Sequence, residues 1–315
     1  MLSPQELLQK ATLTSGTDLG GAGESPLSVE QVTAFIELMA AQQVMLADVR
    51  TVTSSAAKWQ ESVLDFSARI ARAGTEGTRL VDGDRVKPGT DIIELSTVLL
   101  RGEVPVSDEV FEDNVAGQGL AQSLERTISD RFGYDIEDLF VNGDVSGGAD
   151  SYIQQLDGWM IQAQDNGNSV DATSYGQDYQ ELFRVMLNTM PARHLRNLET
   201  DGRFYIPKRT EQKYRDILAS RGTAYGDIML TGKNELTYQG IKIVGVPSIL
   251  ISSNLSKVLL ANRNNLYAGY HRTMKFESWR DPREGATSFV ITARVDAKIA
   301  VPAATVVGYN VDVAV

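Results

Sequence analysis

The sequence predicts an α+β fold, with helices in its first and middle parts and strands gathered toward its end. An apolar stripe at helical spacing runs from Leu120 to Phe140, which predicts one long helix. Two segments of alternating apolar and polar residues flank a glycine-rich stretch at 74–89, which predicts a long hairpin. From Glu235 onward the chain consists of short β-rich runs. Helical and strand patterns that occupy different parts of a chain are typical of the α+β class.

Composition narrows the classes of function. The chain has 315 residues, enough for one large or two ordinary domains. It contains no cysteine, which excludes disulfides, thiolate catalysis and cysteine-ligated metal sites. Its 41 acidic and 30 basic residues give a net charge of −11, and an anionic surface repels nucleic-acid phosphates except where basic groups cluster. No apolar run is long enough to span a bilayer and the first residues lack a secretory-signal pattern, so we expect cytoplasmic synthesis and no membrane partner.

The beginning of the chain is expected to form an arm followed by a helix. Residues 1–27 are rich in Gly, Ser and Pro, a composition typical of a flexible connection. A capping signature at Ser28 precedes apolar residues spaced by three and four, which predicts a helix to about Arg50.

The long hairpin is the feature that points to function. Apolar residues alternate from Leu64 to Ile70, and the return strand is predicted over 91–104, with the next break at Pro105. Charged residues near the tip are expected to be exposed in the free subunit and to contact a neighbour: Glu76, Arg79, Asp82, Asp84, Arg85 and Lys87. A two-stranded arm of this length cannot bury its own faces and is marginal alone in water. The chain is therefore expected to be an assembly subunit and not a self-contained enzyme.

The predicted long helix should pack through one face and end at the pair Asn142–Gly143. The residues expected to form that face are Leu124, Ile128, Phe132, Ile136 and Leu139. Further helices are predicted over 179–190 and 209–220, with a short strand at 204–206 between them.

No constellation of residues predicts catalysis, a cofactor or a metal. His194 and His271 lie far apart in the sequence, with no second histidine at ligand spacing. The segment 226–234 resembles a phosphate-binding loop, but five residues separate its glycines where four are needed. Residues 144–155 resemble a calcium loop, yet the twelfth position is Gln155 in place of the bidentate glutamate. We expect no catalytic, cofactor-binding or metal-ligating residue.

The order of these elements resembles the major capsid protein of tailed double-stranded-DNA bacteriophages. The likeness rests on the hairpin, the phrase VPVSDEVFEDN at 104–114, the long helix that closes in FVNGD at 140–144, and the late strands ITARVDAKIAVPAATVV. Arg294, Asp296 and the pair Pro302–Ala303 support it independently. The resemblance implies a fold with an N-terminal arm, an extended hairpin loop, a peripheral (P) domain built on a spine helix, and an axial (A) domain.

The resemblance also implies boundaries and partners. The arm and first helix would occupy 1–54 and the extended loop 55–99. The P domain would comprise 100–145 and 256–300, and the A domain 146–255 and 301–315. Copies would assemble in the host cytoplasm as hexamers and pentamers into an icosahedral virion shell, which encloses DNA without sequence-specific binding. A separate scaffolding protein, a portal and a decoration protein are the further partners implied, because the N-terminal segment is too short for a built-in scaffold.

One departure and two alternatives bear on these expectations. Some family members cross-link a hairpin lysine to an asparagine on a late strand, but the corresponding strand here, 287–293, has no asparagine, so Lys87 is not expected to form such a bond. An encapsulin-like bacterial nanocompartment shares the fold and is the first alternative. A soluble α+β hydrolase is the second, and it would need a catalytic constellation that the sequence does not display.

Overall fold

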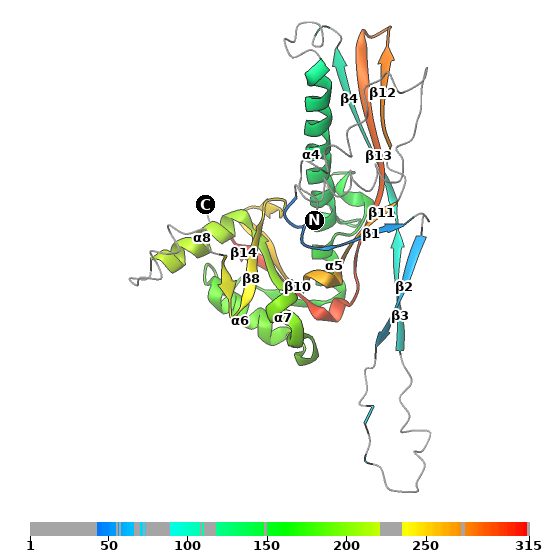
Figure 1. Ribbon diagram of the computed structural model, residues 1–315. Helices are drawn as coiled ribbons and strands as arrows, with labels where there is room; N and C mark the ends of the chain where they lie inside the picture. Colours follow the sequence, from blue (N-terminus) through cyan, green and yellow to red (C-terminus); the bar gives the residue numbers. More distant parts are fainter. Residues whose placement is uncertain are drawn as a thin grey trace.

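The computed structural model describes residues 43–54, 56, 58–65, 70–71, 73, 89–107, 109, 118–147, 150–220, 235–271 and 275–313. The molecule is elongated (Figure 1). A central body carries two sheets, a ribbon of strands beside a long helix extends from it in one direction, and a two-stranded arm extends in the other. The N-terminal segment to residue 42 and the predicted hairpin-tip residues, Glu76, Arg79, Asp82, Asp84, Arg85 and Lys87, lie outside the described residues.

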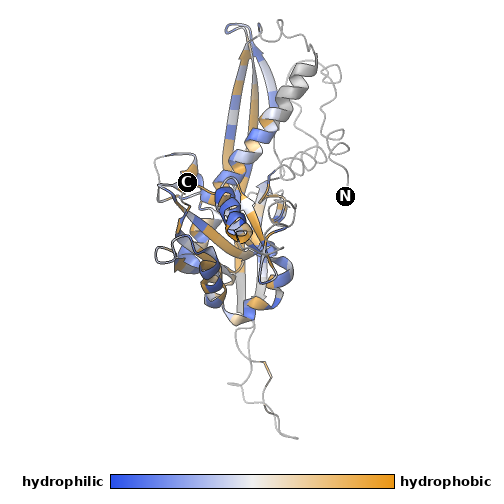
Figure 2. Cartoon of the chain, turned by 90° about the vertical axis from the view of Figure 1, so that its left-hand side faces the viewer, coloured by the Kyte–Doolittle hydropathy of each residue, from blue (hydrophilic) through white to orange (hydrophobic). Residues whose placement is uncertain are grey.

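The ribbon belongs to a five-stranded sheet in which β13 is the central strand. The strands are β1 (Arg50–Ser54), β11 (Leu266–His271), β13 (Ala286–Ile299), β12 (Lys275–Asp281) and β4 (Val98–Ser107). The order is β1-β11-β13-β12, and β4 pairs with β13 along an antiparallel register from Val98–Val295 to Ser107–Ala286. Side chains alternate between hydrophobic and hydrophilic along these strands, the pattern of a sheet with one covered face (Figure 2).

The covered face of the ribbon packs against α4 (Gln118–Asn142), the predicted long helix. Leu100, Ile136, Leu139 and Ala293 share one buried cluster. Gly102 of β4 lies under the ring of Phe132, since a Cβ there would sit 3.9 Å from two ring carbons. The ring of Phe132 thus packs over β4 at ordinary van der Waals distance.

The predicted break at Pro105 is wrong, because β4 continues through it to Ser107. Proline has no N–H to give to a ladder, so it is tolerated only where one side of a strand is unpaired. Within the described residues, β4 pairs with β13 and with no other strand, and Pro105 lies opposite Ser288 on that one partner.

The arm consists of β2 (Lys58–Asp65) and β3 (Gly89–Ser96), paired antiparallel as a separate two-stranded sheet. The predicted hairpin is confirmed for these residues. The predicted single return strand over 91–104 is wrong, because the chain leaves the arm at Ser96 and enters the five-stranded sheet at Val98. The change of sheet occurs where Leu95, 2% exposed, packs against Gly269 and fixes the root of the arm.

The second sheet has seven strands in the order β5-β14-β10-β6-β8-β7, with β9 paired to β10. They are β5 (Asn168–Asp171), β14 (Thr305–Asp312), β10 (Leu255–Asn262), β6 (Gly202–Pro207), β8 (Ile241–Val246), β7 (Thr237–Tyr238) and β9 (Ile251–Ser252). The helices of this part are α5 (Trp159–Asn166), α6 (Tyr179–Thr189), α7 (Leu198–Asp201) and α8 (Lys208–Ala219), with short 3₁₀ turns at Ile153–Gln155, Ala192–Asn197, Arg263–Asn265 and Pro302–Ala304. The predicted helices at 179–190 and 209–220 and the strand at 204–206 are confirmed.

Both faces of the seven-stranded sheet are covered. Leu259 and Ala261 of β10 belong to the core cluster that includes α4 and α5, whereas Val258 and Leu260 belong to the cluster that includes α6 and α8. A strand that is buried on both faces reads as a continuous apolar run, which explains the unbroken segment VLLA.

Two predicted boundaries differ from the sheets. The sequence division assigned 256–300 to the part with the long helix, but β10 lies inside the seven-stranded sheet, since it pairs with both β6 and β14. The helix predicted to Arg50 is wrong for its last turns: residues 43–49 form turns and Arg50 begins β1. The Glu137 side chain of α4 supplies the reason. It accepts hydrogen bonds from the N–H groups of Met45 and Leu46, which a continuing helix would have used within itself.

Candidate assembly surfaces and the junction that holds them

A buried carboxylate on α4 joins three parts of the chain. Glu137 is 1% exposed, and its Oε2 accepts hydrogen bonds from the N–H groups of Met45 at 2.9 Å and Leu46 at 3.3 Å. Its Oε1 accepts from the Ser248 hydroxyl at 2.7 Å. Burial, together with this carboxylate, raises the pKa of the Tyr270 phenol, which therefore stays protonated. Glu137 thus fixes the segment before β1 and the turn after β8 to the long helix.

The end of α4 is tied to the same turn. The Asn142 side chain donates to the carbonyl of Ser248 at 2.6 Å and accepts from the N–H of Leu250 at 3.2 Å. Gly143 follows, and its N–H donates to the carbonyl of Leu139 at 2.9 Å. The predicted end of the helix at Asn142–Gly143 is confirmed. The side-chain amide of Asn142 also ties the end of α4 to the turn after β8 in the second sheet.

An ionic cluster connects the segment before β1 to the seven-stranded sheet. Asp48 accepts from the Tyr205 hydroxyl at 3.0 Å and lies 3.2 Å from Nε of Arg203. Arg263 lies 3.7 Å from the same carboxylate and 3.2 Å from that of Asp201. Burial first, and then the Asp48 charge, raise the pKa of Tyr205 well above its usual value. The body is therefore held as one unit by polar contacts as well as by its cores.

The root of the arm has its own anchor. Asp296 of β13 is 4% exposed, accepts the N–H of Ser96 at 2.6 Å, and accepts the N–H of Ala297 at 2.8 Å. Burial raises the pKa of Asp296 to about 6, against which the two hydrogen bonds and the charge of Lys298 act. This carboxylate therefore holds the chain at the point where it passes from the arm into the five-stranded sheet.

Aromatic and charged side chains brace the arm from β1 and β11. The ring centroids of Trp59 and Tyr267 lie 6.2 Å apart, and the Arg50 guanidinium lies 4.6 Å above the Tyr267 ring. Arg50 also pairs with Glu61 of β2 at 3.4 Å. These contacts hold the proximal end of the arm, whereas Ile92 further along is 61% exposed.

Two surfaces lack a partner within the described part of the chain. One is the exposed side of the arm, with Ile92 on it. The other is the face of the ribbon away from α4, where Leu99 of β4 is 55% exposed and Trp279 of β12 is 56% exposed. Large apolar groups on projecting strands are typical of interaction surfaces.

The predicted packing residues of the long helix are distributed along its length. Ile136 and Leu139 are completely buried, Phe132 packs partly buried against the same cluster, and Ile128 is half-buried. The Leu124 side chain lies outside the described residues, so its predicted role stays a prediction.

Sequence reasoning missed Glu137 and Asp48, which hold the junction, and it noted Asp296 only as part of the family pattern, without its role at the root of the arm. A signal for Glu137 exists, because the residues three and four positions after it, Phe140 and Val141, are apolar and fully buried. A carboxylate on the buried face of a helix needs partners from elsewhere in the fold. No comparable pattern surrounds Asp48.

Side chains suited to metal binding do not gather among the described residues. Among the described residues, no group of three or more His, Asp or Glu side chains is placed to hold a metal ion. His194 accepts a hydrogen bond from its neighbour Arg193, and His271 lies at the end of β11. None of the described helices is long and apolar enough to cross a membrane.

Two projecting surfaces without a partner in the described part of the chain are typical of a subunit that assembles with other chains, and solved structures share this fold. The chain is similar to the structure described as the satellite phage P4 procapsid including size determination (Sid) protein, with a TM-score of 0.69 and 13% identity over 94% of this chain and 95% of that chain. The capsid of the native GTA particle gives a TM-score of 0.65 and 12% identity over 95% and 100% of the two chains. The holo-SrpI encapsulin complex from Synechococcus elongatus PCC 7942 gives 0.54 and 11% over 96% and 98%.

The sequence itself identifies the family. The model of the phage capsid family matches residues 26–309, and the chain belongs to this family. The putative prophage capsid protein YqbE of Bacillus subtilis (strain 168) is 29% identical over 301 residues, which cover 93% of this chain and 94% of that protein. The fold is the tailed-phage capsid fold, and the chain is a structural capsid protein that assembles with copies of itself.

Proposed function

We propose that this chain is the major shell subunit of a tailed phage or prophage, and that its copies assemble as hexamers and pentamers into an icosahedral shell around packaged double-stranded DNA. The observation that carries the proposal is the arm β2–β3, a two-stranded sheet that projects from the body and leaves Ile92 61% exposed. Such an arm gains stability when it lies on a neighbouring copy.

The structural division supports the roles proposed for its parts. The ribbon and α4 would form the P domain, the seven-stranded sheet the A domain, and the arm the extended loop. The proposed hairpin contacts (Glu76, Arg79, Asp82, Asp84, Arg85 and Lys87) would lie on the neighbouring subunit. Many modest contacts of this kind add up to a stable shell, because each subunit engages several neighbours at once.

The remaining partners and the place of assembly form part of the same proposal. Assembly takes place in the host cytoplasm with a separate scaffolding protein, and the finished shell receives a portal and a decoration protein. The net charge of −11 supports an interior that does not bind the genome tightly, since phosphate binding needs clustered basic groups. The subunit needs no cofactor and performs no catalysis.

An encapsulin-like compartment is the second candidate, favoured by the similarity to the SrpI encapsulin complex. The two candidates differ in what the shell contains. Particles purified from cells that carry the neighbouring genes would hold nuclease-protected DNA if the phage proposal is correct. Particles that hold one enzyme and no DNA would refute it in favour of the compartment.

Negative-stain electron microscopy of the expressed chain tests assembly itself. Uniform shells or hexameric sheets are expected from the full chain. Deletion of residues 75–88 should leave the circular dichroism spectrum close to that of the full chain and abolish closed shells. The matched control replaces the same residues with a Gly-Ser segment of equal length, which separates the loss of loop contacts from a change in chain length. Normal shells from both variants would refute the role of the hairpin.

A further inference from the structure

A cavity lies where the end of α4, helix α5, the β9–β10 turn and the end of β14 meet. Its volume is about 670 Å³, within the usual size of ligand sites. Met160 and Ile161 of α5 and Ile249 form apolar walls. Leu250 and Leu255 stand at its edge and are 59% and 42% exposed. An apolar hollow with exposed leucines at its rim favours contact with another protein over an empty surface.

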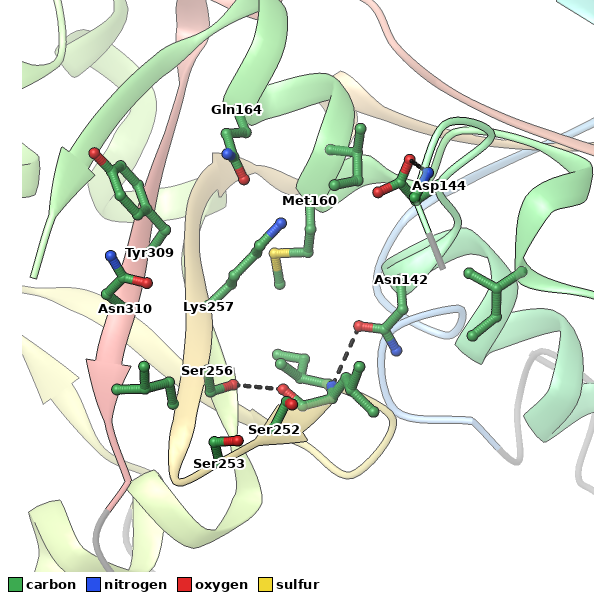
Figure 3. Close-up of a pocket in the computed structure, with 16 residues that line it drawn as sticks. Asn142, Asp144, Met160, Gln164, Ser252, Ser253, Ser256, Lys257, Tyr309 and Asn310 are labelled. Atoms are coloured by element: carbon green, nitrogen blue, oxygen red, sulfur yellow. Dashed lines mark hydrogen bonds between the residues drawn. The ribbon is translucent and has the colours of Figure 1, made fainter. Parts of the chain in front are cut away.

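One cation extends into this cavity without an acceptor. Figure 3 shows the Lys257 side chain reaching from β10 toward Gln164 and Met160. Within the described part of the chain, no hydrogen bond or ion pair reaches its ammonium group. Burial lowers the pKa of Lys257, and the carboxylates of Asp144 and Asp165 oppose that change only through space.

Asp144, one of the two carboxylates that act on Lys257 through space, is engaged in its own turn through one oxygen. Oδ1 of Asp144 accepts from the N–H and hydroxyl of Ser146, each at 2.9 Å, and from the N–H of Gly147 at 2.8 Å. These bonds hold Asp144 in its own turn through Oδ1, and within the described residues no ion pair joins its carboxylate to Lys257.

A second polar group in the cavity also lacks a partner. Oε1 of Gln164 is buried from solvent and accepts no hydrogen bond among the described residues. A buried acceptor without a donor costs free energy, as does a partly desolvated ammonium without a counter-ion. An occupant that brings a carboxylate to Lys257 and apolar cover to Leu250 and Leu255 would therefore stabilise this cavity.

We infer that this cavity receives a carboxylate-bearing segment of a second copy of the chain, whose acidic side chain pairs with Lys257. The inference rests on the proposed function. Charge supports a second copy as the occupant, because the chain has 41 acidic and 30 basic residues and offers carboxylates in excess. The cavity lies on the α5 side of the seven-stranded sheet, opposite the side covered by α6 and α8. Head-to-tail rings require two unlike patches of this kind on one subunit.

The first test compares assembly of matched lysine variants. Lys257→Met keeps the length of the stem and removes the charge, and it should raise the critical concentration for assembly by about tenfold or more, measured by light scattering. Lys257→Arg should assemble nearly as the natural chain does. Lys242→Met is the control, because Lys242 forms an exposed ion pair with Glu235 at 2.6 Å and does not line the cavity.

The second test identifies the occupant. Particles assembled from a mixture of ¹⁵N-labelled and unlabelled chains are treated with a carbodiimide, which joins an amine and a carboxylate that touch. Mass spectrometry should find Lys257 joined to an Asp or Glu peptide with mixed labels, which only two different copies produce. Cross-links of Lys257 confined to one label, or to a foreign protein, would overturn the inference.

The outcomes separate this inference from the proposed function. Failure of the natural chain to assemble under any condition would refute both. Normal assembly of the natural chain and of Lys257→Met at the same critical concentration would refute the inference alone.

Discussion

Replacement of Glu137 is the sharpest test of how the body is held together. Glu137→Ala would leave the N–H groups of Met45 and Leu46 and the hydroxyl of Ser248 without their acceptor in a buried place. Each such loss costs about 1–3 kcal/mol, and rotation of the serine hydroxyl recovers part of one, so the expected cost is about 3–6 kcal/mol. That is a large share of the stability of an ordinary domain, which is about 5–15 kcal/mol.

Glu137→Gln is the matched control. The glutamine carbonyl can accept from both N–H groups while its amide nitrogen donates to the Ser248 oxygen, so only the benefit of the charge is lost, about 1 kcal/mol. Urea unfolding of the unassembled chains, followed by tryptophan fluorescence, measures both variants because Trp159 is fully buried beside Phe140. Alanine and glutamine variants within about 1 kcal/mol of each other would refute the proposed role of the carboxylate.

Three further changes test the arm, the long helix and its end. The pKa of Asp296 is raised from 3.8 to about 6 in the folded chain, so the folded state binds the proton more tightly, and stability should fall by about 3 kcal/mol as the pH rises from about 4 to above 6. Asp296→Asn should flatten that slope in urea titrations across the same pH range, and an unchanged slope would contradict the assignment. Leu139→Asp places a charge at a fully buried site and should cost about 4 kcal/mol or prevent folding, whereas Ile128→Asp at a half-buried site should cost about 1–2 kcal/mol; equal melting temperatures would show that the wrong face was assigned. Gly158→Ala would put a Cβ 2.7 and 2.8 Å from two carbonyl oxygens of the last turn of α4, and calorimetry should show a loss of about 2 kcal/mol. Gly102→Ala is the control, because the nearest contact of its Cβ would be a ring at 3.9 Å.

The parts of the fold that the sequence predicts well are those whose own pattern is long. The stripe from Leu120 to Phe140 covers many turns, and the helix formed there, α4, spans Gln118–Asn142. Helix α5 was missed, because its 8 residues include too few turns to establish a period, although Trp159, Met160 and Ala163 are buried on it. Short elements are stabilised mainly by tertiary contacts, and the local spacing of apolar residues does not reveal those contacts.

The predicted return strand failed for a related reason. The polar pair Ser96–Thr97 interrupts the alternation only briefly, and Thr97 fits a strand pattern with Leu95 and Leu99, so the joint resembles part of one continuous strand. The joint is created by Asp296, almost two hundred positions later in the chain, and by the close approach of Leu95 to Gly269. The same holds for residues 43–49, where the predicted helix is replaced by turns whose N–H groups at Met45 and Leu46 donate to the Glu137 carboxylate. Junctions are therefore the part of this fold that depends most on residues distant in sequence.

The position of β13 has a mechanical consequence. This strand, Ala286–Ile299, pairs with β4, β12 and β11, and its Asp296 holds the start of the passage from the arm. A force applied along β3 is transmitted to β4 through Thr97, the one residue between the two strands. It then acts parallel to the ladder that β4 forms with β13 from Val98 to Ser107. Ladder bonds loaded in this direction share the force, whereas bonds loaded at one end of a ribbon would open one after another. Tension applied to the arm would therefore be carried along the β4–β13 ladder through the centre of the subunit.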